Sequence, residues 1–225
     1  MLRIPFTLAA LSACLALASP VSAQHVPPAG GRPDHMEHRF DNAAEWAKNF
    51  DDPARDAWQM PDRVVAALGL TPGSSVADIG AGTGYFTVRL AKLAAKPKVF
   101  AVDIEPSMVQ HLTHRAMGEG LTNVTAVLAT ADGPNLPQPV DTILIVDTYH
   151  HIPNRVAYFT ALKTKLTSGG RLAIVDFRKG VPGGPPDEFR FTPDQISQEL
   201  AQAGFVLRTS HDFLPRQHFL IYGVK

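Results

Sequence analysis

A short apolar run followed by a glycine-rich turn is the feature that most constrains the fold of this chain. The segment SVADIGAGTGYFTVRLA spans residues 75–91. Its apolar start predicts a buried strand over residues 75–79, and the apolar spacing after the glycines predicts a helix. Glycines at positions 80, 82 and 84 let the backbone turn sharply and lie close to another group. In an α/β protein, such a strand–turn–helix unit lies at the ligand-binding edge of the sheet.

Strands and helices continue to alternate along the chain. Apolar runs predict four further strands, over residues 99–103, 124–128, 141–147 and 171–177. The helix before the last of these is expected to stop at Gly169-Gly170. Thr192 and Pro193 are typical of a helix start, and Gln195 supplies a capping partner.

The end of the chain changes this alternation. Residues 205–209 and 218–224 read as two strands with no helix between them, which predicts an antiparallel hairpin at the edge of the sheet. The predicted fold class is therefore α/β, with a Rossmann-like, doubly wound, seven-stranded sheet that is mostly parallel and has an antiparallel last strand.

A helical segment is expected to precede the first strand. Residues 41–68 are predicted to form an N-terminal helical cap of a domain that spans residues 41–225. Asp41 is expected to cap a short helix that carries Trp46 and Phe50 one turn apart. Pro53 and Pro61 are expected to open two further helices. Residues 24–40 are rich in proline, glycine and histidine and are predicted to be a flexible linker, without a metal site.

The first residues are typical of an export signal. Arg3 is followed by an apolar stretch and by the small residues Val21-Ser22-Ala23, which predicts a signal peptide over residues 1–23. We therefore predict that the protein is periplasmic or secreted, with no stable membrane insertion after cleavage. A retained membrane anchor, a lipid anchor at Cys14, and a cytoplasmic protein whose signal is not used remain alternatives. Cys14 is the only cysteine, so cleavage after Ala23 would leave no thiol chemistry.

Composition bears on the class of partner. Lys plus Arg and Asp plus Glu both number 21, and no basic stripe interleaved with aromatic residues is present. Because nucleic-acid binders usually present a basic face, we predict no nucleic-acid partner. A small-molecule substrate is expected, and the sequence leaves the oligomeric state open.

The residues around the glycines indicate what the turn holds. Tyr85 stands where a dinucleotide-binding turn has its third glycine, and the lysine of a phosphate-binding loop is absent. Asp78 precedes the turn, and its carboxylate would repel a pyrophosphate. A cationic cofactor with an amino group and no phosphate suits this carboxylate, and S-adenosylmethionine has those properties.

Acidic residues also follow the next two predicted strands. Asp103 can accept hydrogen bonds from both ribose hydroxyls, as acidic residues do in dinucleotide folds. Asp132 can accept one from an adenine amino group. The simpler alternative for each aspartate alone is a helix cap or a solvated loop residue. Three acidic residues after three successive strands are expected to meet at one edge of the sheet.

Four segments together resemble the class I S-adenosylmethionine-dependent methyltransferases. They are VADIGAGTGYFTVRLA, VFAVDIEPSMVQHL, DTILIVDTYHHI and GGRLAIVDF, and the resemblance covers residues 61–225. It is strongest to the small-molecule branch, which includes quinone-biosynthesis and arsenite methyltransferase-like enzymes. An arsenite substrate is disfavoured, because the arsenite enzymes need several cysteines.

This resemblance implies roles for individual residues. The methionine end of the cofactor is assigned to Asp78, Gly80, Gly82 and Gly84. The ribose is assigned to Asp103, the adenine ring to Ile104 and the adenine amino group to Asp132. We expect three further residues beside the cofactor, namely Ala81, Tyr85 and Asp147.

The segment DTYHHI is expected to face the transferred methyl group. His150 is the predicted general base or substrate hydrogen-bonding group, because an imidazole titrates near neutral pH. Tyr149, His151 and Arg178 are predicted substrate-binding residues. As an alternative, one histidine caps the following helix and the other packs in the core. Trp58 and Gln59 can lie near the cofactor on a lid, and no catalytic metal is predicted.

Two further functions remain open at this point. One is an exported protein that keeps the fold as a catalytically inactive binding module. The other is an aminopropyl transferase on the same fold, although no clear acidic polyamine site is present. An oxidoreductase is disfavoured by Tyr85 at the glycine position.

Overall fold

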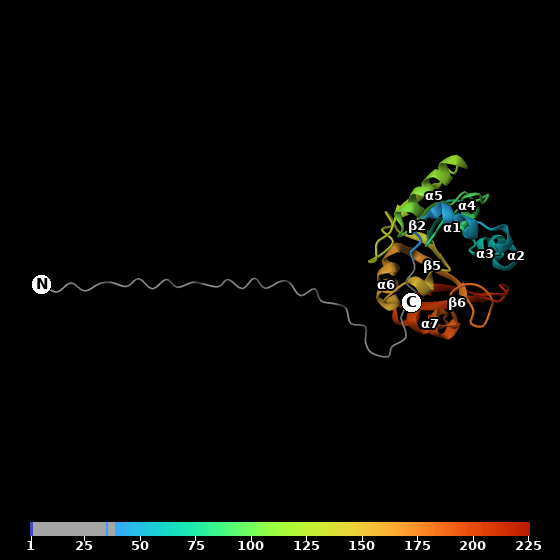
Figure 1. The fold of residues 1–225 in the computed structure, drawn as a ribbon. Helices are drawn as coiled ribbons and strands as arrows, with labels where there is room; N and C mark the ends of the chain where they lie inside the picture. Colours follow the sequence, from blue (N-terminus) through green and yellow to red (C-terminus); the bar gives the residue numbers. More distant parts are fainter. Residues whose placement is uncertain (2–34, 36–38) are drawn as a thin grey trace. The chain divides into compact units, whose positions relative to one another are not determined.

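The structure is a computed structural model that describes residue 1, residue 35 and residues 39–225. The predicted signal peptide and nearly all of the predicted linker lie outside the described residues. All elements described below belong to the unit of residues 32–225 (Figure 1). Within the described part of the chain, no helix combines the length and the hydropathy that a membrane span requires.

A seven-stranded sheet with the order β3-β2-β1-β4-β5-β7-β6 organises this unit. Neighbours from β3 to β5 pair in parallel, whereas β7 is antiparallel to both β5 and β6. The predicted fold class is therefore confirmed, including the final antiparallel hairpin. The strands are β1 (Ser75–Ile79), β2 (Lys98–Asp103), β3 (Val124–Leu128), β4 (Val140–Val146), β5 (Leu166–Phe177), β6 (Phe205–His211) and β7 (Gln217–Val224).

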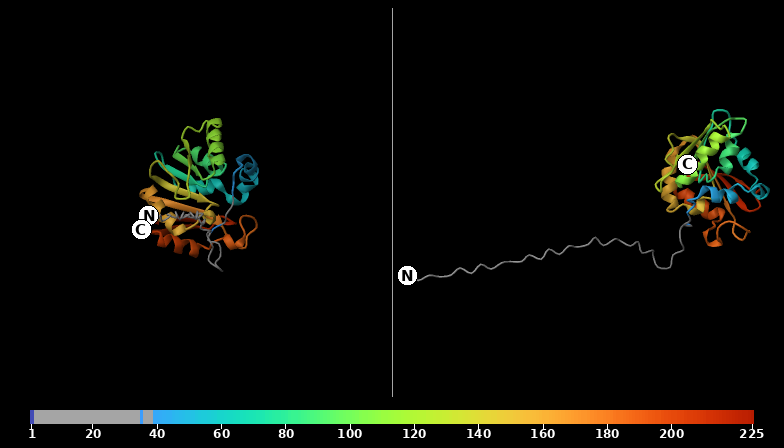
Figure 2. Two further views of the ribbon diagram at one scale, coloured as in Figure 1. Left: turned by 60° about the vertical axis from the view of Figure 1, so that its left-hand side comes forward. Right: turned by 45° about the horizontal axis from the view of Figure 1, so that its top comes forward.

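Helices cover both faces of the sheet (Figure 2). One apolar cluster packs side chains such as Phe159 and Leu200 against one face, and a second packs side chains such as Val65 and Leu90 against the other. These helices are α3 (Pro61–Ala67), α4 (Tyr85–Ala91), α5 (Pro106–Gly118), α6 (Arg155–Leu162) and α7 (Pro193–Gln202). Short 3-10 turns are η2 (Tyr149–His151), η3 (Lys163–Lys165) and η4 (Asp187–Phe189). Because β1 is buried along its whole length, its carboxyl end is a rigid support for the glycine turn.

The N-terminal segment forms α1 (Ala43–Phe50), η1 (Pro53–Arg55) and α2 (Asp56–Gln59) before α3. The predicted helix starts at Pro53 and Pro61 are confirmed. The predicted cap at Asp41 is wrong by one residue, since the Asn42 side chain accepts the hydrogen bond from the Glu45 backbone N–H, at 3.3 Å. Asn42 holds this position because its amide oxygen satisfies a free donor of the first turn.

The predicted helix stop at Gly169-Gly170 is wrong. Helix α6 ends at Leu162, and β5 begins at Leu166. Leu166 pairs with Val140, and the register then shifts so that Thr142 pairs with Arg171. This irregularity places the two glycines inside the strand, where their missing side chains permit the distortion. The capping box of α7 is confirmed, because the Thr192 backbone N–H donates to Gln195 Oε1 at 2.9 Å.

Candidate active site

A cavity of about 1040 Å³ lies at the carboxyl ends of β1, β2 and β4. Its wall also includes residues of α1 and α2 and of the loop that follows β5, so distant parts of the sequence meet there. Parallel strands of an open sheet bind ligands at this edge. The position of the cavity agrees with the predicted site.

Two of the three glycines form part of the cavity wall. Gly80 has φ 75°, and a Cβ added there would overlap the Thr148 side chain, at 2.8 Å from its Cβ. Gly82 lies against the Phe50 ring. A Cβ added to Gly82 would lie 3.2 Å from the nearest carbon of that ring. Gly84 is not part of the wall, because it begins α4 and faces Leu112 of α5. The first two glycines therefore serve the cavity, and the third allows two helices to pack.

Asp78 is buried at the end of β1 and forms part of the cavity wall. Its Oδ2 accepts a hydrogen bond from Thr87 Oγ1 at 2.7 Å. Burial raises the pKa of Asp78 to about 6, and the nearby charge of Asp103 adds to the rise. Within residues 39–225, no lysine or arginine forms an ion pair with this carboxylate. A buried carboxylate without a positive partner favours a cationic ligand.

Asp103, at the end of β2, is held by two backbone N–H groups. Gly82 N donates to its Oδ2 at 2.8 Å, and Glu105 N donates to its Oδ1 at 3.0 Å. Burial raises the pKa of Asp103 above its ordinary value, and the two N–H groups oppose that rise. Each carboxylate oxygen keeps a lone pair for a further donor, such as a ribose hydroxyl. Ile104 follows as an exposed side chain on the cavity wall.

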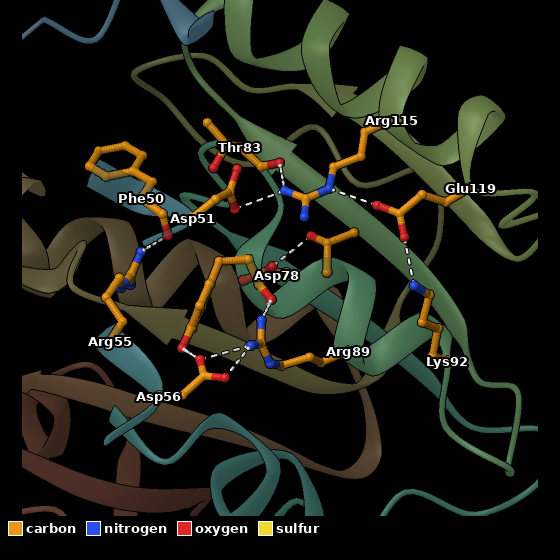
Figure 3. Close-up of polar contacts among 12 residues, drawn as sticks. Phe50, Asp51, Arg55, Asp56, Asp78, Thr83, Arg89, Lys92, Arg115 and Glu119 are labelled. Atoms are coloured by element: carbon orange, nitrogen blue, oxygen red, sulfur yellow. Dashed lines mark hydrogen bonds and ion pairs between the residues drawn. The ribbon is translucent and has the colours of Figure 1, made fainter. Parts of the chain in front are cut away.

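Sequence reasoning missed Thr83, which lies between two of the glycines. Its side chain is 1% exposed and forms part of the cavity wall, and its hydroxyl has no hydrogen-bond partner among the described residues. Its backbone carbonyl accepts from Arg115 Nη1 at 2.8 Å (Figure 3). Buried hydroxyls normally have partners, so the unpaired Thr83 hydroxyl beside the cavity is an exception. The glycine pattern gave no signal for it, because any small residue fits between glycines.

Asp132 does not reach the cavity. It is exposed, and the wall at this position consists of Ala129, Thr130 and Ala131. An interaction of the Asp132 side chain with a ligand in the cavity is therefore not supported by its position. The turn after β3, in which Thr130 and Gly133 bond to each other, directs Asp132 outward.

His150 lies in η2, on the cavity wall, and binds Asp176 of β5. Its Nδ1 lies 2.9 Å from Asp176 Oδ1, and its backbone N–H donates to Oδ2 at 3.2 Å. Both side chains are at least 95% buried. Burial alone lowers the pKa of His150, but the charge and hydrogen bond of Asp176 outweigh it and raise the pKa above its ordinary value. Sequence reasoning missed Asp176, a single carboxylate in an otherwise apolar strand.

Two of the predicted substrate-binding residues do not reach the cavity. Tyr149 is fully buried, stacks on Phe159, and donates its hydroxyl hydrogen to Glu199 Oε2 at 2.5 Å. The 3-10 turn η2 directs Tyr149 into the core, and the prediction for it is wrong. Arg178 is also absent from the wall, and its Nε donates to the Gln217 carbonyl at 2.8 Å. His151 does form part of the wall, where its ring meets the Phe40 ring edge to face.

Asp147 occupies a strained position at the end of β4, with φ 51°. Its Oδ2 accepts from Gln59 Nε2 at 2.9 Å, and its Oδ1 accepts from Gln217 Nε2 at 2.5 Å. Burial raises the pKa of Asp147 to about 6, and the charge of Asp176 adds to it. Asp147 thus joins α2 to β7 and also lies on the cavity wall. Left-handed backbone at a non-glycine residue is often found at binding sites.

Polar contacts hold the N-terminal segment over the glycine turn (Figure 3). The Tyr85 ring lies between the guanidinium groups of Arg55 and Arg89, at 4.1 and 4.0 Å, and its hydroxyl donates to Asp56. Arg115 of α5 pairs with Asp51 at 2.8 Å. Tyr85 therefore anchors α2 as well as forming part of the wall, a role its sequence position did not indicate.

Known proteins resemble this chain over most of its described part. The family described as "Methyltransferase domain" matches residues 70–206, which is more than half of the chain. A solved SAM-dependent methyltransferase from Aquifex aeolicus superposes with a TM-score of 0.75 and 25% identity, covering 82% of this chain and 99% of that one.

Curated relatives match a shorter region. Demethylmenaquinone methyltransferase of Tropheryma whipplei (strain Twist) is 34% identical over 110 residues, which cover 49% of this chain and 44% of that protein. The 27-O-demethylrifamycin SV methyltransferase of Amycolatopsis mediterranei (strain S699) is 30% identical over 122 residues, which cover 53% of this chain and 44% of that protein. The matched region thus spans less than half the length of these two relatives. With the strand order and the family match together, the chain belongs to the class I S-adenosylmethionine-dependent methyltransferase superfamily.

Proposed function

We propose that this protein transfers the methyl group of S-adenosylmethionine to a small-molecule acceptor. The observation that carries the proposal is the buried Asp78 carboxylate, which has no positive partner among the described residues and shares one cavity with Asp103. A carboxylate in that state suits the ammonium group of the cofactor, and Asp103 suits its ribose.

The cavity is large enough for a ligand of the size of the cofactor. Pockets for one drug-sized ligand measure about 300–1,000 Å³, and this cavity measures about 1040 Å³. When bound, the cofactor supplies an activated methyl group on a positively charged sulfur. The protein has to position the acceptor in line with that methyl group, exclude water and accept a proton where the acceptor carries one. We assign His150 as the residue that accepts this proton.

The identity of the acceptor does not follow from the family. The two curated relatives are named for acceptors as different as demethylmenaquinone and 27-O-demethylrifamycin SV. The acceptor class therefore has to be inferred from the residues of this chain's own cavity wall.

Calorimetry on the purified protein tests the cofactor assignment. S-adenosylmethionine and S-adenosylhomocysteine should bind, and NADH should not. Asp103→Asn should weaken the binding of S-adenosylmethionine about 10–100-fold, because it removes a charged acceptor from two hydroxyls. The matched control Asp132→Asn should leave affinity unchanged, because Asp132 is exposed and off the cavity wall. Failure of the wild-type protein to bind either compound would contradict the proposal. Binding without any methyl transfer would favour an inactive binding module.

We also propose that the protein is exported, with cleavage after Ala23. The basis is the order of Arg3, an apolar stretch and the small residues before position 24. Expression of the full chain in a Gram-negative host, followed by fractionation and intact mass measurement, tests this. A periplasmic protein that begins at Gln24 is the expected result. A cytoplasmic protein that retains Met1, or a membrane fraction lipid-modified at Cys14, would overturn it.

A further inference from the structure

The contacts between His150 and Asp176 fix both the position and the tautomer of the imidazole. Nδ1 of His150 lies 2.9 and 3.0 Å from the two carboxylate oxygens, and its backbone N–H donates to the same carboxylate. Phe177 N donates to Asp176 Oδ1 at 2.7 Å and holds the carboxylate in turn. A carboxylate accepts hydrogen bonds, so Nδ1 carries a proton, and in the neutral imidazole Nε2 carries the lone pair. Within the described residues Nε2 has no hydrogen-bond partner, and His150 is on the cavity wall.

The charges around His150 determine when it can accept a proton. Asp176 on β5 and Asp147 at the end of β4 favour the protonated ring, whereas burial and Arg190 oppose it, and the neighbouring His151 ring lies 4.3 Å away. A cationic cofactor in the same cavity adds a positive charge and shifts the balance toward neutral His150. Neutral His150 with its lone pair at Nε2 is a general base.

Aromatic side chains also form part of the cavity wall. Trp58 of α2 and Phe177, the residue after Asp176, have ring centroids 5.5 Å apart, and Tyr158 of α6 belongs to the same wall. Rings of this kind favour flat ligands that stack or meet them edge to face.

The loop after β5 completes this wall and is held in place by one buried arginine. Arg190 is 5% exposed and donates hydrogen bonds to the carbonyls of residues 178, 181, 183 and 185. Pro185 and Pro186, which face the cavity, are thereby fixed before any ligand binds. A preformed wall lowers the entropy cost that the protein pays on binding, and a rigid ligand loses less entropy of its own than a flexible chain does.

Proton chemistry narrows the acceptor further. The hydroxyl of a phenol has a pKa of about 10, so an imidazole can remove its proton far more readily than that of an aliphatic alcohol. A buried histidine base that is hydrogen-bonded to a carboxylate contributes to the reaction only if the acceptor has to lose a proton during methyl transfer.

We propose that the methyl acceptor is a planar aromatic compound with an acidic hydroxyl group, that Nε2 of His150 removes the hydroxyl proton, and that Asp176 is the residue that positions His150 for this step. The inference rests on the proposed function and adds the acceptor class and the role of Asp176. The acceptor oxygen forms a bond to the methyl carbon as the carbon–sulfur bond breaks, and the electron pair of that bond goes to sulfur. The hydroxyl proton goes to Nε2 and then to solvent, so no oxidant or reductant is needed.

Binding is measured first, on the mature protein with S-adenosylhomocysteine present. Binding is measured by calorimetry, because the aromatic probes absorb light in the range used for tryptophan fluorescence and the controls do not. The probes are phenol, 4-nitrophenol and 2-naphthol, with cyclohexanol as the aliphatic control and decanoate as the flexible-chain control. The aromatic hydroxyl compounds should bind with a lower Kd than either control.

Transfer of a tritiated methyl group to the same probes is measured second. Wild-type protein should methylate the aromatic hydroxyl compounds and neither control. His150→Gln should lower kcat about 10²–10⁴-fold, the usual contribution of a general base, with unchanged affinity for S-adenosylmethionine. His114→Gln, an exposed histidine on α5, is the matched control and should behave as wild type.

The pH profile separates positioning from a merely structural role. In the wild type, kcat should fall on the acid side as His150 becomes protonated. Asp176→Asn removes the charge that favours protonation, so the acid limb should move to lower pH while the plateau falls about 10–100-fold. Asp176→Glu should restore part of the rate. Thermal melts and cofactor calorimetry on each variant exclude unfolding as the cause.

Three outcomes overturn the inference without touching the proposed function. One is a wild-type protein that binds S-adenosylmethionine but methylates decanoate or cyclohexanol as well as it does the phenols. Another is a wild-type protein that binds S-adenosylmethionine but methylates no phenol at any pH. The third is phenol turnover by His150→Gln within threefold of wild type. Loss of S-adenosylmethionine binding by the wild type would instead overturn the proposed function itself.

Discussion

In the half of the cavity next to β1 and β2, the wall includes the glycine turn with Thr83, the carboxylates of Asp78 and Asp103, and the rings of Phe50 and Tyr85. We call this the cofactor half. In the half next to β4 and β5, the wall includes the rings of Trp58 and Phe177, the two histidines of η2 and the Asp147 carboxylate. We call this the acceptor half. The first half comes mainly from one short stretch and the end of the next strand, whereas the second joins residues more than a hundred positions apart in the chain.

This difference in construction suits two different tasks. A cofactor shared by a whole superfamily can be held by main-chain geometry at strand ends, where substitutions are constrained by the turn. An acceptor that differs between relatives is better met by side chains on loops and added helices, which can change without altering the sheet. The four predictions below test this division between the halves, in order of decreasing expected effect.

The largest effect is expected in the cofactor half, from Gly80→Ala. The new Cβ would overlap the Thr148 side chain, and φ at this position is 75°. Strain and overlap together should lower the free energy of unfolding by about 2–5 kcal/mol and abolish S-adenosylmethionine binding. Urea denaturation and calorimetry measure both. Gly120→Ala is the control, since Gly120 also has positive φ but has nothing within 4 Å of an added Cβ. Equal losses in the two variants would show that strain alone matters.

The second prediction concerns Asp78 and pH. The pKa of Asp78 is raised to about 6, so the folded protein binds a proton there more tightly than the unfolded chain does. Its contribution to stability is therefore present at low pH and is lost as pH rises through about 6. Asp78→Asn should raise the free energy of unfolding at pH 8 by about 1–3 kcal/mol, while affinity for S-adenosylmethionine falls. In the wild type, that affinity should decrease as pH is lowered below about 6. A cofactor affinity independent of pH between 5 and 8 would contradict a direct contact.

In the cofactor half, sequence reasoning expected Asp78 and Asp103 at one edge of the sheet, and both lie on the cavity wall, because the signals there are local. The strand, the turn and the strand-end aspartates lie in a fixed order along the chain, and that order carried over into the strand order of the sheet. It failed for Asp132 because the direction of a loop side chain depends on a turn closed by Thr130 and Gly133. Thr83 was missed because an unpartnered hydroxyl is visible only when its surroundings are known.

The acceptor half could be predicted only in outline. The segment DTYHHI was expected to face the cavity, but the 3-10 turn sends Tyr149 inward and leaves the two histidines on the wall. Asp176 lies within an apolar strand, and no sequence rule joins it to His150 before the parallel pairing of β4 and β5 is known. Gln59 was expected near the cofactor, and its bond to Asp147 shows how α2 is tied to the end of β4. Contacts of this kind arise from packing across the sheet.

The third prediction separates the two halves by ligand. Trp58→Ala removes one aromatic wall of the acceptor half, so aromatic hydroxyl probes should bind about 5–20-fold more weakly. Affinity for S-adenosylmethionine should change less than twofold. Calorimetry with each ligand in turn checks this, and Phe213→Ala, an aromatic residue away from the cavity, is the control. Equal weakening of both ligands would show that Trp58 supports the whole cavity rather than one half of it.

The smallest effect is expected from two unpartnered hydroxyls. Thr83 and Thr142 are each 1% exposed, and both have a hydroxyl without a partner, but only Thr83 is on the cavity wall. Replacing either with valine removes an unsatisfied polar group, so each variant should be as stable as wild type or more stable by about 1 kcal/mol. The two should differ in function. Thr83→Val should weaken S-adenosylmethionine binding about 3–10-fold, the value of one hydrogen bond, whereas Thr142→Val should leave it unchanged. If both variants bound the cofactor as wild type does, the Thr83 hydroxyl would not belong to the cofactor half, and its lack of a partner would be a feature of core packing alone.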